Sequence, residues 1–187
     1  RYLQLAAENN MWIVQPSTPA NHFHMLRTQA YKRPRKPLIA FTPKQLLRLH
    51  AASSHLEEFT TGSFTPVYGE VDSRVETNRV SRVILCSGRV YYDLIHEREE
   101  RGAWNTAIIR VEQLYPLPTE ELRQALSTFP NAELLWVQDE PKNQGIWPHF
   151  ALNLFPELGI APTLVSRPES ATTAAGRASL HREQAAE

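Results

Sequence analysis

The chain has 187 residues, and its 20 Lys and Arg balance its 20 Asp and Glu, so its formal net charge is zero. This balance gives no electrostatic reason to expect a nucleic acid or an anionic membrane surface as a partner. No apolar run approaches the roughly 20 residues that cross a bilayer. A single cysteine, Cys86, permits no internal disulfide, which fits a reducing compartment.

The first fifty residues have the pattern of a β-α-β unit. Two short apolar runs, at residues 11–14 and 37–41, predict strands, and Thr18 is the expected cap of a helix that starts at Pro19. That helix is predicted to bury one apolar face, made of Phe23, Leu26 and Ala30. Residues 1–9 have the pattern of a helix that began earlier, and the chain lacks an initial Met, so we expect a fragment of a longer protein.

Residues 44–79 are expected to form an ordered connecting arm, because small, polar and acidic residues dominate there while apolar anchors recur. Beyond them, strand and helix patterns alternate. Strands are predicted at residues 82–86, 105–111, 133–137 and 163–166, and helices at residues 89–101, 119–128 and 147–154. This alternation predicts right-handed β-α-β units and an α/β fold with a mostly parallel sheet flanked by helices.

The turn after the strand at residues 82–86 is a candidate anion site. Gly88 can adopt a positive φ there, and the amides that follow begin a helix, where negative charge is stabilised. Ligands of open parallel sheets collect at the carboxyl ends of the strands. We therefore predict an anion or nucleotide effector site made of Ser87, Gly88, Arg89, Asn143, Gln144 and Arg167. The alternative is an ordinary tight turn capped by Ser87, with solvated arginines.

The stretch Trp136-Val-Gln-Asp-Glu-Pro-Lys-Asn-Gln-Gly-Ile-Trp147 also follows a predicted strand, which Pro141 is expected to end. Its adjacent acids, Asp139 and Glu140, could do acid–base work. The favoured interpretation is that they pair or cap at an interface, to which the two flanking tryptophans are also expected to belong.

The histidines and the cysteine give no sign of a metal site. His22 and His24 lie two residues apart, which points their side chains to different faces of a helix, and no Cys and His cluster has zinc spacing. Cys86 ends a predicted buried strand without an adjacent base. It is therefore interpreted as a small hydrophobic residue rather than a nucleophile.

Four segments occur in a fixed order: Gln15-Pro-Ser-Thr-Pro-Ala-Asn-His-Phe-His-Met-Leu-Arg27, Cys86-Ser-Gly-Arg-Val-Tyr-Tyr-Asp-Leu94, Arg110-Val-Glu-Gln-Leu-Tyr-Pro116 and the acidic stretch described above. They resemble the C-terminal end of the thiamine-diphosphate-dependent, decarboxylating first component of 2-oxoglutarate dehydrogenase. The resemblance runs from Arg1 to about His181. It departs at Lys44-Gln-Leu-Leu-Arg48, where Gln45 replaces a serine that is typical of the family.

The resemblance implies a transketolase-like homodimer that decarboxylates 2-oxoglutarate on thiamine diphosphate. The succinyl group would pass to the lipoyl arm of the dihydrolipoyl succinyltransferase component. The cofactor, its magnesium ion and the substrate-binding histidines are expected outside this chain, so no catalytic, metal-binding or cofactor-binding residue is assigned within it. The family also implies a nucleotide effector, acetyl-CoA or AMP, for the C-terminal domain.

By the same resemblance, residues 1–50 close the pyrimidine-binding domain, residues 51–79 are the connector arm, and residues 80–187 are the C-terminal α/β domain. The chain is expected to serve dimerisation and effector binding, to be inactive alone, and to be cytoplasmic in a bacterium or in the mitochondrial matrix of a eukaryote, with the bacterium favoured. Two alternatives stay open. One is a relative that acts on 2-oxoadipate, and the other is a non-catalytic α/β binding or dimerisation module.

Overall fold

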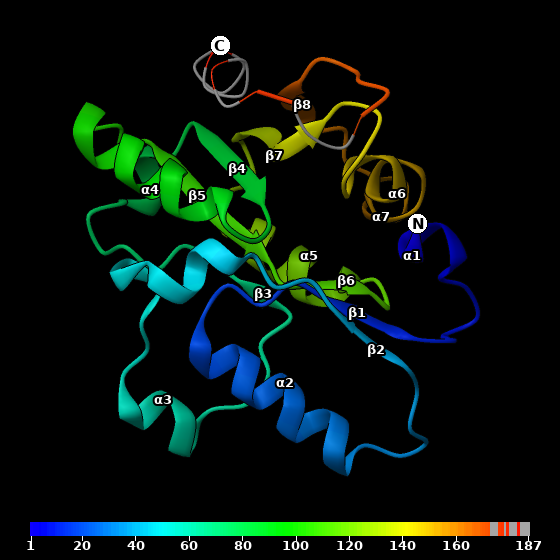
Figure 1. Ribbon diagram of the computed structural model, residues 1–187. Coiled ribbons are helices and arrows are strands. Elements are labelled where there is room, and N and C mark those ends of the chain that lie inside the picture. Colours follow the sequence, from blue (N-terminus) through cyan, green and yellow to red (C-terminus); the bar gives the residue numbers. More distant parts are fainter. Residues whose placement is uncertain (173–175, 178, 180–182, 184–187) are drawn as a thin grey trace.

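The computed structural model of the chain describes residues 1–172, 176–177, 179 and 183 (Figure 1). Two sheets form its frame, a larger one with the strand order β3-β5-β4-β7-β8 and a smaller one with the order β2-β1-β6. The strands are β1 Trp12–Val14, β2 Leu38–Ala40, β3 Val67–Tyr68, β4 Arg82–Cys86, β5 Thr106–Val111, β6 Gln113–Tyr115, β7 Glu133–Pro141 and β8 Thr163–Arg167.

The helices cover both sheets. They are α1 Tyr2–Leu5, α2 Pro19–Tyr31, α3 Leu56–Thr61, α4 Val90–Arg101, α5 Thr119–Ser127, α6 Trp147–Leu152 and α7 Leu154–Leu158, with 3-10 turns η1 Lys44–Arg48, η2 His50–Ala52 and η3 Thr77–Arg79. Figure 1 shows α2 beside the smaller sheet and α1 next to α6 and α7. Within the described residues, no helix is both long enough and apolar enough to cross a membrane.

The larger sheet confirms the predicted mostly parallel sheet flanked by helices. Strand β4 pairs in parallel with β5 and β7, and β7 pairs in parallel with β8. Alternate residues of β4 face opposite sides, as a pleated strand requires. Val83 and Leu85 pack in the core with Leu122 of α5 and Phe150 of α6, while Cys86 packs on the other side with the first turn of α4.

Helix α2 begins as predicted but buries a different face. The Thr18 hydroxyl accepts a hydrogen bond from the Asn21 amide at 3.2 Å, and Pro19 is the first helical residue. The predicted apolar face is wrong, because Phe23, Leu26 and Ala30 are exposed. The buried face is formed by Ala20, Asn21, His24 and Met25. Two of these side chains are polar, and each has a hydrogen-bond partner, Glu112 for Asn21 and the Glu58 carbonyl for His24. Apolar periodicity alone could therefore not find this face.

Two strands were not predicted, and both tie distant segments together. The connecting arm supplies β3, which pairs antiparallel with β5, so part of the arm is the edge of the larger sheet. Strand β6 follows β5 directly and pairs antiparallel with β1, while β2 pairs with β1 in parallel. The Trp12 indole reinforces this contact by donating to Gln113 Oε1 at 2.8 Å. The smaller sheet is therefore completed by residues from the second half of the chain.

Two boundaries near the acidic stretch differ from the prediction. Strand β7 does not stop before Pro141, because after a shift in register Pro141 still pairs with Arg167 of β8. The single helix predicted over residues 147–154 is broken at Asn153, whose side-chain amide donates to the His149 carbonyl at 2.7 Å. Pro156 explains the break, since it has no N–H and its ring would meet the carbonyl four residues earlier in a continuous helix.

Trp136 was expected at an interface and lies in the core instead. Its side chain is fully buried and packs edge to face on Phe150, with Phe155 next to it. The prediction failed because a polar neighbourhood in sequence says little about which face of a strand a residue occupies. Cys86 is buried, as its interpretation as a small hydrophobe requires, and burial raises the pKa of its thiol.

Candidate functional site

The turn after β4 meets the end of β1 in close contact. Gly88 has φ of +70°, and a Cβ at this position would collide with the side-chain amide of Gln15. Next to it, the Ser87 hydroxyl donates to Gln15 Oε1 at 3.2 Å. Glycine is therefore required twice here, for the left-handed backbone and for the space that Gln15 fills.

A polar pocket of about 300 Å³ opens beside this turn. It is lined by Gln15, Pro43, Lys44, Gln45, Ser87, Arg89, Asp139 and Glu140. The Arg89 guanidinium contacts Asp93 at 2.6 Å and both carboxylate oxygens of Asp139 at 3.0 and 3.1 Å. Lys44, by contrast, makes no ion pair with any residue that the structure describes. The pocket thus contains Arg89, whose charge is balanced by two carboxylates, and Lys44, which has no ion-pair partner among the described residues.

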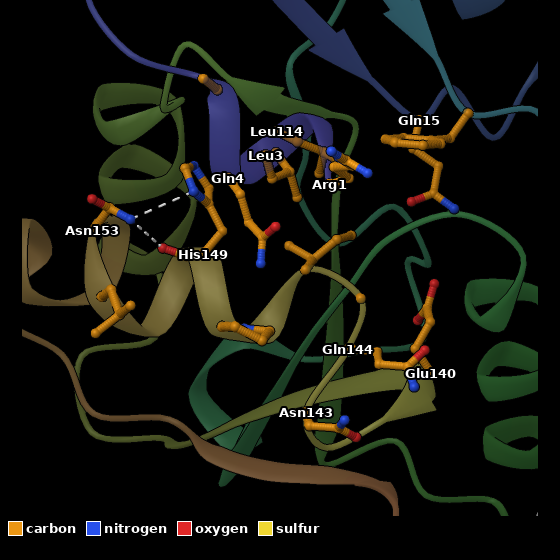
Figure 2. Close-up of a pocket in the computed structure, with 16 residues that line it drawn as sticks. Arg1, Leu3, Gln4, Gln15, Leu114, Glu140, Asn143, Gln144, His149 and Asn153 are labelled. Carbon is orange, nitrogen blue, oxygen red and sulfur yellow. Dashed lines mark hydrogen bonds between the residues drawn. The ribbon is translucent and has the colours of Figure 1, made fainter. Parts of the chain in front are cut away.

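A larger pocket of about 710 Å³ adjoins the polar pocket, and Gln15 and Glu140 line both. Figure 2 shows Gln4 and His149 together on one side of it and the loop with Glu140, Asn143 and Gln144 on another. Burial raises the pKa of Glu140 and lowers the pKa of His149. Both shifts have the same physical cause, since burial disfavours the charged form of each group. Both side chains can form hydrogen bonds with a polar ligand.

The loop between β7 and α6 is organised by Gln138, a buried side chain that sequence reasoning did not single out. Its Oε1 accepts from the Trp136 indole at 3.1 Å and from the Trp147 amide at 3.0 Å. Its Nε2 donates to the Gln144 carbonyl at 2.9 Å. Gly145, at φ +71°, lets the loop close against Glu140. The signal available in the sequence was an amide between two tryptophans in an otherwise apolar strand.

The six predicted anion-site residues lie at the same end of the larger sheet but not around one cavity. Ser87 and Arg89 line the polar pocket, with Gly88 between them in the turn, while Asn143 and Gln144 line the larger one. Both of these amides also donate to the Ser170 carbonyl, at 2.9 and 2.8 Å. Arg167 lines neither pocket and donates from Nε to the Asp139 carbonyl at 2.6 Å. Arg89, from the turn after β4, and Arg167, from β8, thus contact the same residue, Asp139.

A second polar cluster, which was not predicted, lies under these pockets. The carboxylate of Glu112, with no exposed surface, accepts from the Ser17 amide at 2.7 Å, the Ser17 hydroxyl at 2.5 Å and the Asn21 side chain at 3.1 Å. Arg110 donates to the same Ser17 hydroxyl at 2.9 Å. Burial raises the pKa of Glu112, and Arg110 opposes that rise. These contacts join two of the sequence motifs, around residues 15–27 and 110–116.

These features define an α/β protein of the transketolase type, with polar pockets at the carboxyl ends of parallel strands. Residues 53–187 match the family model described as 2-oxoglutarate dehydrogenase C-terminal, and residues 1–50 match transketolase, pyrimidine binding domain. The chain therefore belongs to the 2-oxoglutarate dehydrogenase C-terminal family.

Curated relatives agree with this membership. The chain is 45% identical over 188 residues to the 2-oxoglutarate dehydrogenase E1 component of Haemophilus influenzae, a match that covers 98% of this chain and 20% of the relative. The relative from Azotobacter vinelandii, with the same description, is 45% identical over 191 residues with the same coverage. The 2-oxoglutarate dehydrogenase E1/E2 component of Corynebacterium glutamicum is 43% identical over 97% of this chain and 15% of its own length. The chain thus spans about a fifth or less of these relatives.

Proposed function

We propose that the chain is the C-terminal part of a 2-oxoglutarate dehydrogenase first component. Such an enzyme decarboxylates 2-oxoglutarate on thiamine diphosphate and transfers the succinyl group to the lipoyl group of a succinyltransferase component. The observation that carries this proposal is the order of the two family matches, with a pyrimidine-binding match at residues 1–50 followed by the dehydrogenase C-terminal match at residues 53–187. The named relatives support the same activity.

The described residues do not contain a set of side chains that could hold the diphosphate of the cofactor together with its magnesium ion. In that part of the chain, no three His, Cys, Asp or Glu side chains gather as metal ligands. A magnesium ion needs several oxygen ligands in addition to the phosphates. The diphosphate and its metal are therefore proposed to bind to parts of the protein outside this chain, and the chain is proposed to be inactive alone.

An assay of both forms of the protein tests this proposal. The complete protein, supplied with thiamine diphosphate and Mg²⁺, is expected to reduce ferricyanide with 2-oxoglutarate, and the 187-residue chain is expected to show no turnover. Activity of the isolated chain, in a preparation free of host enzyme, would contradict the assignment of its role. Activity of the complete protein with 2-oxoadipate but not with 2-oxoglutarate would contradict the proposed substrate.

We also propose that the polar pocket binds the phosphate of an effector such as AMP or acetyl-CoA. Lys44 supports this because it is unpaired, and Ser87 supports it because its hydroxyl can exchange the Gln15 acceptor for a phosphate oxygen. Arg89 adds a guanidinium that is already held in place by two carboxylates. A phosphate would share this guanidinium with Asp139, so affinity depends on how far the acid can be displaced.

Arg89→Ala is expected to weaken AMP binding by about 1.5–3 kcal/mol, the contribution of a hydrogen bond to a charged group. The variant also leaves Asp93 and Asp139 facing the phosphate. Calorimetry on the complete protein measures the change. Arg82→Ala is the matched control, because Arg82 lies at the other end of the same strand and pairs with Glu133 at 3.0 Å. Equal losses of AMP affinity in both variants, or no loss in either, would contradict the proposed phosphate site.

A homodimer is proposed as the assembly of the complete protein. Residues 9–56 contain no Asp or Glu but seven cationic side chains: Arg27, Lys32, Arg33, Arg35, Lys36, Lys44 and Arg48. Large apolar side chains are exposed in the same region, among them Tyr31 at 81%, Leu47 at 86% and Leu56 at 79%. A groove of about 870 Å³ runs along η1 and η2 beside the start of α2.

Exposed apolar side chains gathered in this way are typical of an interface that is covered in the assembled protein. Leu47→Glu is therefore expected to shift the protein toward monomer, as followed by sedimentation velocity at tens of micromolar. Leu152→Glu is the control, because Leu152 is equally exposed, at 79%, but lies on α6. A monomeric wild-type protein would contradict the proposal.

A further inference from the structure

Gln15 lies where the polar pocket and the larger pocket meet, and it lines both. Its side chain is held from one side only, by the Ser87 hydroxyl and by the close approach of Gly88. Its backbone is held from the other side, because its amide donates to the Glu112 carbonyl at 2.7 Å. The position of Gln15 is therefore set jointly by the turn after β4 and by the segment that follows β5.

Ser17, two residues further on, has a hydrogen bond on every polar atom. Its amide and hydroxyl both donate to the Glu112 carboxylate, and its hydroxyl accepts from Arg110. Its carbonyl accepts from the Tyr92 hydroxyl at 2.8 Å. Because all these partners lie on β5, on the segment after it or on α4, residues 15–17 are fixed by the second half of the chain rather than by their own helix.

A buried carboxylate is a costly way to fill this space. Removing an ion from water costs several kcal/mol, and an apolar side chain of similar volume is often as good for stability. Glu112 is nevertheless satisfied by three donors, which favour its ionised form, and Arg110 is held nearby between the rings of Tyr68 and Tyr91, at 4.5 and 4.0 Å. Unlike an apolar side chain, the carboxylate forms directional hydrogen bonds, and these fix the positions of Ser17 and Asn21.

We propose that Glu112 is a positioning residue that fixes Gln15 at the junction of the two pockets and links ligand binding at Ser87 to helix α2. This inference rests on the proposed phosphate site and adds its means of regulation. A phosphate that takes the Ser87 hydroxyl replaces the Gln15 oxygen as acceptor. The main-chain carbonyl of Glu112 holds the Gln15 amide, and its carboxylate holds Ser17. With the backbone fixed in this way, the released side chain turns toward the larger pocket, and the change reaches α2 through Ser17 and Asn21.

The link has two defined arrangements, which is what coupling between sites requires. In one, the hydrogen bond between Ser87 and Gln15 is made and the larger pocket keeps its present wall. In the other arrangement, that bond is broken and the side-chain amide of Gln15 points into the larger pocket. Without the Glu112 carboxylate, the Ser17 amide and hydroxyl lose their acceptor. The displaced Gln15 is then held only by its main-chain bond to residue 112, so its direction is less well fixed.

The test compares Glu112→Gln with the wild type in the complete protein. Glu112→Gln keeps the shape of the side chain and one acceptor but loses the charge and the second acceptor. Hydrogen–deuterium exchange over residues 15–25 is expected to be about tenfold faster, which corresponds to one lost hydrogen bond. The calorimetric dissociation constant for AMP is expected to rise by about the same factor. Glu70→Gln is the matched control, because Glu70 is a comparably buried carboxylate that pairs with Arg98 and contacts β5 at Ile108, away from residues 15–21.

A double-mutant cycle separates positioning from general destabilisation. In a Gln15→Ala background, Glu112→Gln is expected to have no further effect on AMP affinity, because the side chain that it positions is gone. If the wild type does not bind AMP, the phosphate site fails and exchange over residues 15–25 alone decides the positioning role. The proposal is overturned if Glu112→Gln leaves exchange and affinity unchanged, if Glu70→Gln alters them equally, or if the effects of Glu112→Gln and Gln15→Ala simply add.

Discussion

Two buried glutamates, each close to an arginine, contact opposite ends of strand β5 and differ in how the glutamate and the arginine are connected. Glu70 and Arg98 touch directly at 2.6 Å, with side chains 9% and 5% exposed. Glu112 and Arg110 are joined through a third residue, since both bond to the Ser17 hydroxyl. Glu70 and Arg98 bond to each other, whereas Glu112 and Arg110 both bond to Ser17 and so also fix the segment that contains it.

The other hydrogen bonds of the first pair hold separate parts of the chain together. Glu70 also accepts from the Ile108 amide at 2.7 Å, and Arg98 donates to the Thr106 carbonyl at 3.1 Å. These bonds of Glu70 and Arg98 hold the connecting arm against β5 and α4. The second pair reaches residues 15–21, which border the pockets. Similar residue types therefore serve stability at one place and the shape of a site at the other.

Arg98→Ala is expected to have the largest effect, a loss of about 3–5 kcal/mol in the free energy of unfolding, because it leaves Glu70 buried without its counter-charge. Urea denaturation of the chain measures this loss. Arg101→Ala on the same helix removes an exposed arginine that pairs with Glu97, and is expected to cost less than about 1 kcal/mol. A small loss for Arg98→Ala would mean that the pair of Glu70 and Arg98 is not a structural clamp.

Glu112→Gln is expected to change how stability depends on pH. Burial raises the pKa of Glu112 above 4.5, although Arg110 lowers it, and Tyr68, Tyr92 and Cys86 also lie close enough to interact with this charge. The folded protein therefore holds this proton to higher pH than the unfolded chain. The stabilisation is complete below pH 4.5 and is lost as pH rises through the folded pKa.

The variant is expected to remove this pH-dependent loss, because a glutamine side chain does not titrate. The melting temperatures of the wild type and Glu112→Gln, measured at intervals of about one pH unit between pH 4 and pH 8, show whether the pH dependence differs. Parallel curves for the two proteins would contradict the raised pKa.

Asp72→Asn is expected to have the smallest effect, and it acts in the opposite pH direction. The hydrogen bond from Arg74 lowers the pKa of Asp72 from 3.8 to about 2. This contribution is present above pH 3.8 and is lost as pH falls toward 2. It is expected to be below about 1 kcal/mol, because the Arg74 side chain is half exposed. Acid titration of the melting temperature measures it, and a variant that keeps the wild-type acid transition would rule it out.

The sequence predicted the elements that depend on local pattern. Thr18 and Pro19 start α2, and β4, β5 and β8 lie within a residue of their predicted bounds, because each carries a strong apolar run or a cap of its own. Gly88 has the positive φ that was expected for it. Family membership was also predicted, because four motifs in a fixed order are specific even without a structure.

The features that were missed depend on partners far away in sequence. Strand β6 has only three residues and exists because β1 is beside it. The buried face of α2 contains Asn21 and His24, which become compatible with the interior only when Glu112 and the Glu58 carbonyl are brought to them. The polar cluster around Glu112 could not be predicted for the same reason. A glutamate in a short apolar run gives no indication of whether it is buried until the facing segment is placed.

The pairing of β1 with β6 also orders events during synthesis of the protein. Trp12 and Gln113 are 101 positions apart, so β1 leaves the ribosome long before its partner exists. At about 5–20 residues per second, the first strand waits several seconds with an open edge. Such an edge is prone to pair with other chains. The nascent protein is therefore most vulnerable to aggregation, and most dependent on chaperones, in the interval before residue 115 emerges.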